Sequence, residues 1–146
     1  MLLWDLETRS ERAFLPVSRG AYFSISADGK TIAESDGPAI IVWDLVTLRE
    51  RSRIDCNQSS TSGILGMMNF DLSTSGRFLA VSYERILKDG DFVELWDLEG
   101  VPHPIAGSSS NGGFAHQLAF SPDGQTLALA CFDDTVKLWN LSNFLK

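Results

Sequence analysis

Short apolar runs separated by polar turn sequences recur along the whole chain. Around the turn Ala27-Asp28-Gly29, apolar and β-branched residues at 21–25 and 31–34 predict two strands, and runs at 39–44 and 49–54 predict two more. Asp and Gly supply the positive-φ positions that a tight hairpin turn requires, so these turns join antiparallel strands. Sustained helical periodicity is absent from the sequence. The pattern therefore predicts an all-β fold.

The same pattern returns several times, which indicates an internal repeat. Turns comparable to the one at Gly29 occur around Gly76 and Gly124. An apolar strand ending in Trp-Asp or Trp-Asn occurs four times and uses all four tryptophans of the chain, at Trp4-Asp5, Trp43-Asp44, Trp96-Asp97 and Trp139-Asn140. Each unit is therefore predicted to be a small antiparallel meander.

Together, the turn and the Trp-Asp ending resemble the WD40 repeat family, whose repeats of roughly 40 to 45 residues each form a four-stranded propeller blade. The resemblance covers nearly the whole chain and is most specific at 118–140. It implies a partial WD40-type β-propeller of about three degenerate four-stranded antiparallel repeats. Because closed propellers typically need 4 to 8 blades, we expect an open arc rather than a closed ring.

The resemblance also implies how residues 1–146 are divided, because in this family the Trp-Asp strand is third from the centre of its blade. Residues 1–16 would supply the outer strands of a partial blade, 17–54 a first full blade, 55–106 a second full blade with an insertion at 83–91, and 107–146 the inner strands of a last blade. The start at a Trp-Asp strand favours a truncated reading frame. Uncovered blade faces at both ends predict self-association, or a longer chain that completes the propeller.

The family often carries a hydrogen-bonded set, consisting of a His, a Ser or Thr and an Asp, that supports the Trp indole. Residues Asp133 and Trp139 match this set in the last repeat, whereas Cys131 or Ala130 replaces the hydroxyl and Asn111 lies near the His position. The resemblance therefore implies that Asp133 supports Trp139. The alternative is that Asp133 only forms a turn.

Composition changes the picture mainly by exclusion. An apolar share of 44% with 21% charged residues excludes global disorder, and a net charge of −7 with scattered basic residues argues against nucleic-acid binding. No apolar run approaches the roughly 20 residues of a membrane span, and the N-terminal sequence does not resemble a signal peptide. We therefore expect a cytoplasmic protein with protein partners. Cys56 and Cys131 are expected to be reduced and buried, with a disulfide as the alternative.

Three longer connections, at 55–63, 83–91 and 107–113, are the candidates for contact with a protein partner. The segment 83–91 combines an aromatic residue, two aliphatic residues and mixed charge, as a contact loop does. The alternative is an extended hairpin whose aliphatic residues fold back on its own blade. The candidate contact residues are Asp55, Asn57, Tyr83, Arg85, Ile86, Leu87, Lys88 and Asn111.

The sequence predicts no catalytic residue, no cofactor and no metal site. Asp28-Gly29-Lys30-Thr31 resembles the end of a phosphate loop, but Ser24 occupies the place of the required earlier glycine. We therefore expect a non-catalytic scaffold for protein–protein interaction. The alternative is a fragment of a longer multidomain regulatory or signalling protein in which the propeller is the sensory or docking arm. A weaker interpretation is a propeller enzyme that uses Asp133, His103 or His116.

Overall fold

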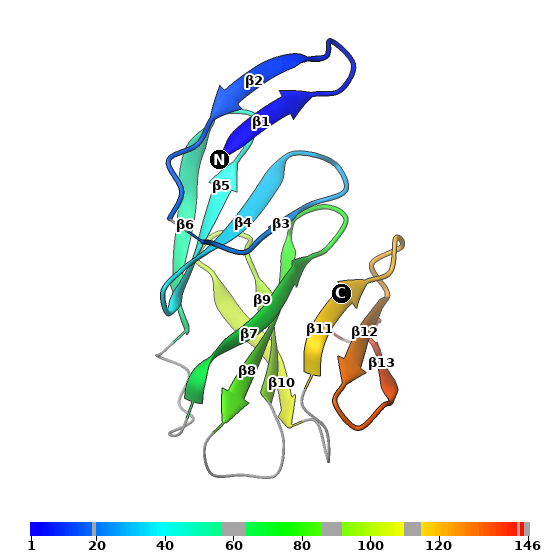
Figure 1. The fold of residues 1–146 in the computed structure, drawn as a ribbon. Helices are drawn as coiled ribbons and strands as arrows, with labels where there is room; N and C mark the ends of the chain where they lie inside the picture. The colour runs from blue at the N-terminus through cyan, green and yellow to red at the C-terminus, as the bar shows by residue number, and fades with distance from the viewer. Residues whose placement is uncertain (19, 57–63, 86–91, 110–114, 143, 145–146) are drawn as a thin grey trace.

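The part of the chain that the structure describes is built from β-strands. The computed structural model describes residues 1–18, 20–56, 64–85, 92–109, 115–142 and 144 (Figure 1). Thirteen strands occur in it: β1 (Leu2–Asp5), β2 (Ser10–Phe14), β3 (Phe23–Ile25), β4 (Thr31–Asp36), β5 (Ala39–Asp44), β6 (Arg49–Asp55), β7 (Ile64–Leu72), β8 (Phe78–Arg85), β9 (Phe92–Asp97), β10 (His103–Ser109), β11 (Ala115–Phe120), β12 (Thr126–Cys131) and β13 (Val136–Asn140). The all-β prediction is confirmed.

These strands form four antiparallel sheets, each made of strands consecutive in sequence. The N-terminal sheet pairs β1 with β2, the first four-stranded sheet has the order β3-β4-β5-β6, the second has the order β7-β8-β9-β10, and the C-terminal sheet has the order β11-β12-β13. Figure 1 shows the sheets following one another from the blue N-terminal hairpin to the red C-terminal strand. This arrangement is consistent with part of a β-propeller.

The predicted hairpin strands are found close to their expected bounds. The segments 31–34, 39–44 and 49–54 correspond to β4, β5 and β6, while β3 is shorter than the predicted segment 21–25. Tyr22 lies just before β3, and its N–H donates to the Ser35 hydroxyl, 2.8 Å away, while its carbonyl accepts from the Ser35 N–H. A side-chain acceptor thus replaces one ladder bond, so the pairing continues beyond the regular strand.

The tight turns share one hydrogen-bonding scheme in three sheets. In the first, the Ser26 hydroxyl oxygen accepts the Thr31 N–H at 3.0 Å, and the Gly29 N–H donates to the Ser26 carbonyl. Ser73 with Gly76, and Ser121 with Gly124, form the equivalent backbone bond. The three glycines have positive φ, between 67° and 70°. Glycine adopts this conformation without a Cβ clash, which is why each turn ends on one.

The first strands of successive sheets are joined to one another by polar contacts. The Asp71 carboxylate on β7 accepts the Ser24 hydroxyl of β3 at 2.8 Å through one oxygen, and the Phe120 N–H of β11 at 2.9 Å through the other. Nearby, the Thr74 hydroxyl donates to the Pro122 carbonyl, and the Thr74 carbonyl accepts the Asp28 N–H. The strands β3, β7 and β11 therefore lie side by side, with β7 between the other two.

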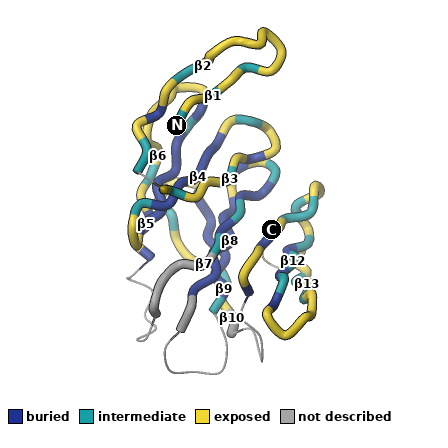
Figure 2. The backbone as a smooth tube through the Cα atoms, in the orientation of Figure 1, coloured by how far each residue is buried: buried dark blue, intermediate teal, exposed yellow. Residues whose placement is uncertain are grey.

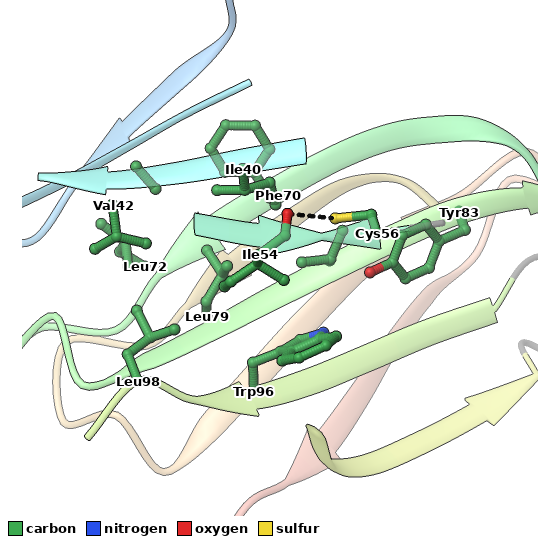
Figure 3. Packing of buried hydrophobic residues seen from close by; sticks show 12 residues of the cluster. Ile40, Val42, Ile54, Cys56, Phe70, Leu72, Leu79, Tyr83, Trp96 and Leu98 are labelled. Carbon is green, nitrogen blue, oxygen red and sulfur yellow. Dashed lines mark hydrogen bonds between the residues drawn. The ribbon is translucent and has the colours of Figure 1, made fainter. Parts of the chain in front are cut away.

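Three apolar clusters fill the spaces between neighbouring sheets. The largest joins the two four-stranded sheets and contains Ile40, Val42, Leu79, Tyr83 and Trp96 (Figure 3). A second joins the second four-stranded sheet to the C-terminal sheet, and a third joins the N-terminal sheet to the first four-stranded sheet. Alternate residues of strands such as β5 and β8 thus face two different cores, which explains why these strands carry apolar residues on both faces.

Both cysteines are free and buried, in agreement with the reduced state expected from the sequence. Burial raises the pKa of the Cys56 thiol to about 11, and its sulfur lies 3.9 Å from the Ile54 carbonyl oxygen (Figure 3). A thiol with so high a pKa forms little thiolate at neutral pH and is a poor nucleophile. Within the described residues, no helix has the length and apolar character needed to cross a membrane.

Candidate functional site

The four Trp-Asp or Trp-Asn units occupy one structural position. Trp43 and Trp96 lie in β5 and β9, the third strands of the four-stranded sheets, and Trp139 lies in β13, the third strand of the C-terminal sheet. Trp4 lies in β1, whose pairing with β2 matches the outer pair of the complete sheets. The sequence repeat is therefore also a repeat in three dimensions.

The acidic member of each unit caps the turn that follows the strand. Asp5 accepts the N–H groups of Glu7 and Thr8 at 2.9 and 2.8 Å, and Asp44 accepts those of Val46 and Thr47 at 2.8 Å each. These backbone bonds hold the pKa of both carboxyls below the usual value. Such turns satisfy backbone donors where the ladder ends, so the Asp positions have a structural role.

Asp97 makes the same turn and also holds a cation. Its carboxylate accepts the Glu99 N–H at 2.8 Å and three hydrogen bonds from Arg77, two from Nε at 3.2 and 3.3 Å and one from Nη2 at 2.8 Å. The Arg77 guanidinium, followed by the backbone bond, lowers the pKa of Asp97. A second carboxylate, that of Glu99, lies 3.1 Å from Arg77 Nη1. The turn after β9 is therefore more strongly tied down than its equivalents.

Replacing Asp97 with asparagine should lower the free energy of unfolding by about 2 kcal/mol at pH 7, because a charge-assisted pair is lost. Since the folded-state pKa is lowered, this stabilisation is present above the unfolded value near 3.8 and is lost as pH falls through the folded pKa. The difference from wild type should therefore shrink below that pH. Urea unfolding across a pH series measures it.

The matched control for this prediction is Asp44→Asn, because Asp44 caps the same turn without a bidentate arginine. The control should cost less than about 1 kcal/mol, since asparagine still accepts the backbone bonds. Equal losses in the two variants, or a loss for Asp97→Asn that persists at pH 2, would contradict a dominant role for Arg77.

Two tryptophan indoles are held by glutamates that the sequence analysis did not single out. Trp43 Nε1 donates to Glu34 Oε1 at 3.0 Å, and Trp96 Nε1 donates to Glu94 Oε2 at 3.2 Å. Both glutamates are almost fully buried. The available signal was their place, because each lies in a strand that contributes apolar residues to the cores, such as Ile32 in β4 and Leu95 in β9. A buried carboxylate there requires a polar partner.

Of the set expected to support the last tryptophan, the structure describes the surroundings of Asp133. The Asp133 carboxylate accepts the Thr135 N–H at 3.2 Å and the Thr135 hydroxyl at 2.5 Å, and lies 3.7 Å from Lys137 Nζ. Asp133 therefore forms a turn before β13, and its support of Trp139 stays a prediction. The position nearest the expected histidine, Asn111, lies outside the described residues.

The candidate contact residues fall into three groups. Tyr83 is fully buried in β8 rather than exposed in a loop, because the strand continues to Arg85 and its ring joins the core between the two four-stranded sheets. Asp55 ends β6 and is exposed. Arg85 ends β8, and nothing is described of its side chain. Asn57, Ile86, Leu87, Lys88 and Asn111 lie outside the described residues.

The two histidines each contact a different partner. His103 begins β10, where its Nδ1 lies 3.0 Å from the Val101 carbonyl oxygen, and His116 in β11 packs edge-on against the Phe132 ring at 4.7 Å between centroids. Among the described residues, no group of three or more His, Cys, Asp and Glu side chains is arranged to hold a metal ion.

The strongest surface feature is a pair of apolar faces, one on the N-terminal sheet and one on the C-terminal sheet. Figure 2 shows that much of the backbone of these two sheets is exposed. The N-terminal face, on the outer side of β1 and β2, consists of Leu2, Trp4, Leu6 and Phe14. Trp4 is 58% exposed, whereas its equivalents Trp43 and Trp96 are each 8% exposed. The residue types of this face are thus those that the interior sheets bury.

The C-terminal face, on the outer side of β12 and β13, consists of Ala128, Ala130, Val136 and Leu138. Leu138 directly precedes Trp139 and is 69% exposed, whereas Val42 and Leu95, which precede Trp43 and Trp96, are fully buried. Apolar patches of this kind on a folded domain mark sites where another surface packs. The sequence signal for this face was that Leu138 occupies the same repeat position as the core residues Val42 and Leu95.

No protein-family model matches this chain. The comparison that remains is between the repeats of this chain, because the same strand position can be followed through three of its sheets. The interior sheets show which face packs on which. The face that bears Val42 packs against the face that bears Trp96, and the face that bears Leu95 packs against the sheet that bears Trp139.

Proposed function

We propose that this chain is a WD40-type β-propeller segment that serves as a non-catalytic scaffold for protein–protein interaction. The observation that carries the proposal is the pair of uncovered end faces. Each has the composition of an interior sheet face, yet Trp4 and Leu138 are mostly exposed. The Trp at the third strand and the repeated turn at Gly29, Gly76 and Gly124 support the WD40 assignment.

The occupant that fits these faces is a second copy of the chain. Inside the molecule, a face of the Leu138 type packs on a face of the Trp4 type at the junction between the two four-stranded sheets. One copy's C-terminal face is therefore complementary to another copy's N-terminal face. Because this contact joins unlike surfaces, it is heterologous and leads to a ring if it closes, or to an open assembly if it does not.

Light scattering on the purified chain tests the proposal. We expect a discrete species larger than the chain mass of 16.1 kDa that melts cooperatively, and Leu138→Asp should shift it to the monomer. The control is Val101→Asp, which places the same charge on an exposed residue between β9 and β10 that belongs to neither face. A wild-type monomer with a sharp two-state melt would contradict self-association.

The same two faces favour a second candidate, in which further sheets of a longer regulatory or signalling protein cover them. In that case the isolated chain should be polydisperse or melt without cooperativity, and Leu138→Asp should improve its solubility without producing a single assembly size. A longer chain, extended by adjoining coding sequence where in-frame repeats exist, should then become monodisperse.

A further inference from the structure

A small cavity lies between the N-terminal sheet and the first four-stranded sheet, near the start of β3. Its volume is about 270 Å³, which is the size of one side chain rather than of a large cofactor. The walls are mainly apolar, and Glu34 of β4 is the acidic group among the residues that line it. The other residues that shape it include Met1, Val17, Ser18, Ala21 and Phe23.

The two carboxylate oxygens of Glu34 differ in their hydrogen bonding. Its Oε1 accepts the Trp43 indole N–H at 3.0 Å, while Oε2 is buried and has no hydrogen-bond partner in the part of the chain that the structure describes. The residue is only 1% exposed. Burial raises the pKa of this carboxyl, and the indole bond opposes that shift. Among the nearby charges, Asp36 raises the pKa and the Met1 ammonium, which donates to the Leu15 carbonyl, lowers it. A buried acceptor without a donor is costly unless something else supplies one.

The other sheets show that the fold does not require a carboxylate at this position. Ile32, Leu79 and Leu127 each lie opposite the tryptophan of the next strand, and Glu34, Val81 and Leu129 stand two residues further along. Val81 and Leu129 are fully buried aliphatic residues. Glu34 thus places a carboxylate where its equivalents place an aliphatic side chain. It lines a cavity and has an oxygen that the Trp43 indole does not use, which points to a ligand in addition to its role in holding the indole.

The surroundings select the chemistry of that ligand. An acidic floor repels anions and attracts a positive charge, and apolar walls suit a methylene chain behind the charge. Phe23 is 63% exposed and presents an aromatic ring, which also attracts cations. The Ser18 hydroxyl is already committed, since it donates to Asp36 Oδ1 at 2.5 Å. Glu34 is therefore the acceptor left for the ligand.

We propose that this cavity binds a cationic group on a short aliphatic chain, such as a lysine or arginine side chain of a partner protein presents, with the positive end on Glu34. Only one part of this proposal rests on the scaffold function, namely that the cation belongs to a partner protein. Binding of a cation in the cavity can be tested separately with small probes. It lies on the inner side of β1, whereas the N-terminal face is on the outer side, so the two sites can fail separately.

The experiment is an NMR titration that follows the tryptophan indole N–H signals. The probes are N-acetyl-lysine methylamide and N-acetyl-arginine methylamide, with N-acetyl-norleucine methylamide as the neutral control. The chain must carry no N-terminal extension, because Met1 lines the cavity. We expect a saturable shift of the Trp43 signal with at least one cationic probe, while the Trp96 signal, held by Glu94, stays in place. Trp43→Phe assigns the signal.

Glu34→Gln keeps an acceptor for the Trp43 indole and removes the charge, so binding of the cationic probe should fall at least ten-fold. Glu34→Val introduces the residue type of Val81 in the next sheet and should abolish binding of the cationic probe. This second variant keeps the test valid if Glu34→Gln folds poorly. The matched control is Glu94→Gln, which alters the other tryptophan-bound carboxylate and should leave the affinity unchanged. The lysine and arginine arms identify which side chain is preferred.

Three results would overturn the proposal. They are the absence of a saturable Trp43 shift with both cationic probes, equal binding of the norleucine probe, and unchanged binding in Glu34→Gln. Arg19→Ala is titrated in parallel, because this residue, outside the described part, adjoins Ser18 and Gly20 in sequence. Binding that occurs only in Arg19→Ala would also overturn it, since the natural chain would then not accept an external cation.

Discussion

Replacing Gly76 with alanine should destabilise the fold by about 3 kcal/mol, far more than the same change in the equivalent turns. Gly76 has a φ of +67°, and a Cβ placed there would lie 2.4 Å from Thr31 Oγ1 and 2.6 Å from Thr31 Cβ. Thr31 is buried at the start of β4 in the preceding sheet and has little room to move. The cost combines about 1 kcal/mol for the positive φ with the clash between sheets.

The chain contains matched controls for this result. Gly29 and Gly124 occupy the same turn with φ of +68° and +70°, and a Cβ at either position would meet no atom within 4 Å. Each alanine variant should therefore cost only about 1 kcal/mol, the contribution of the backbone conformation alone. Urea unfolding of the three variants gives the comparison. Similar losses at all three positions would show that the contact between Gly76 and Thr31 does not constrain the junction.

The second large effect is expected at Leu95. This residue is fully buried between the second four-stranded sheet and the C-terminal sheet, so Leu95→Ala should cost about 2 to 5 kcal/mol through lost burial and the cavity left behind. Leu138 holds the same position relative to its tryptophan and is 69% exposed. In an isolated chain, Leu138→Ala should change the free energy of unfolding by less than about 0.5 kcal/mol.

The comparison of Leu95 with Leu138 becomes informative when protein concentration is varied. If a second copy covers the C-terminal face, the cost of Leu138→Ala should grow with concentration, because association stabilises the folded state by mass action. The cost of Leu95→Ala should depend less on concentration. Chemical unfolding at two concentrations a hundred-fold apart measures both. A concentration-independent value near zero for Leu138→Ala would mean that this face remains uncovered in solution.

The strands and turns were predictable because their signals are local. The turn at Gly29 requires a positive φ, which the local sequence indicates. The apolar run at 39–44 has the same first and last residues as β5. The Trp-Asp units gave the periodicity, and the structure explains why an Asp or Asn follows each Trp: Asp44, for example, caps the next turn. Local chemistry and repeat position agree at these sites.

The candidate sites were harder to predict because they depend on which strands face each other. Tyr83 is aromatic and precedes a charged segment, which favours a loop, yet β8 extends past it and the neighbouring sheet covers it. Glu34 resembles an ordinary polar residue of a half-exposed strand until the adjoining sheet is in place. Met1 and residues of the connection after β2 line the cavity beside it, and sequence periodicity does not report such contacts.

The two-sided bond of Asp71 gives the molecule a central unit for assembly. Through its two oxygens this one carboxylate reaches β3 on one side and β11 on the other, so the flanking sheets are joined through β7. The first four-stranded sheet and the C-terminal sheet are thus both bonded to the second four-stranded sheet, which is the one with a neighbour of this kind on each side. We therefore expect folding to begin in the β7–β9 meander and to spread outward in both directions, as in other linear repeat arrays.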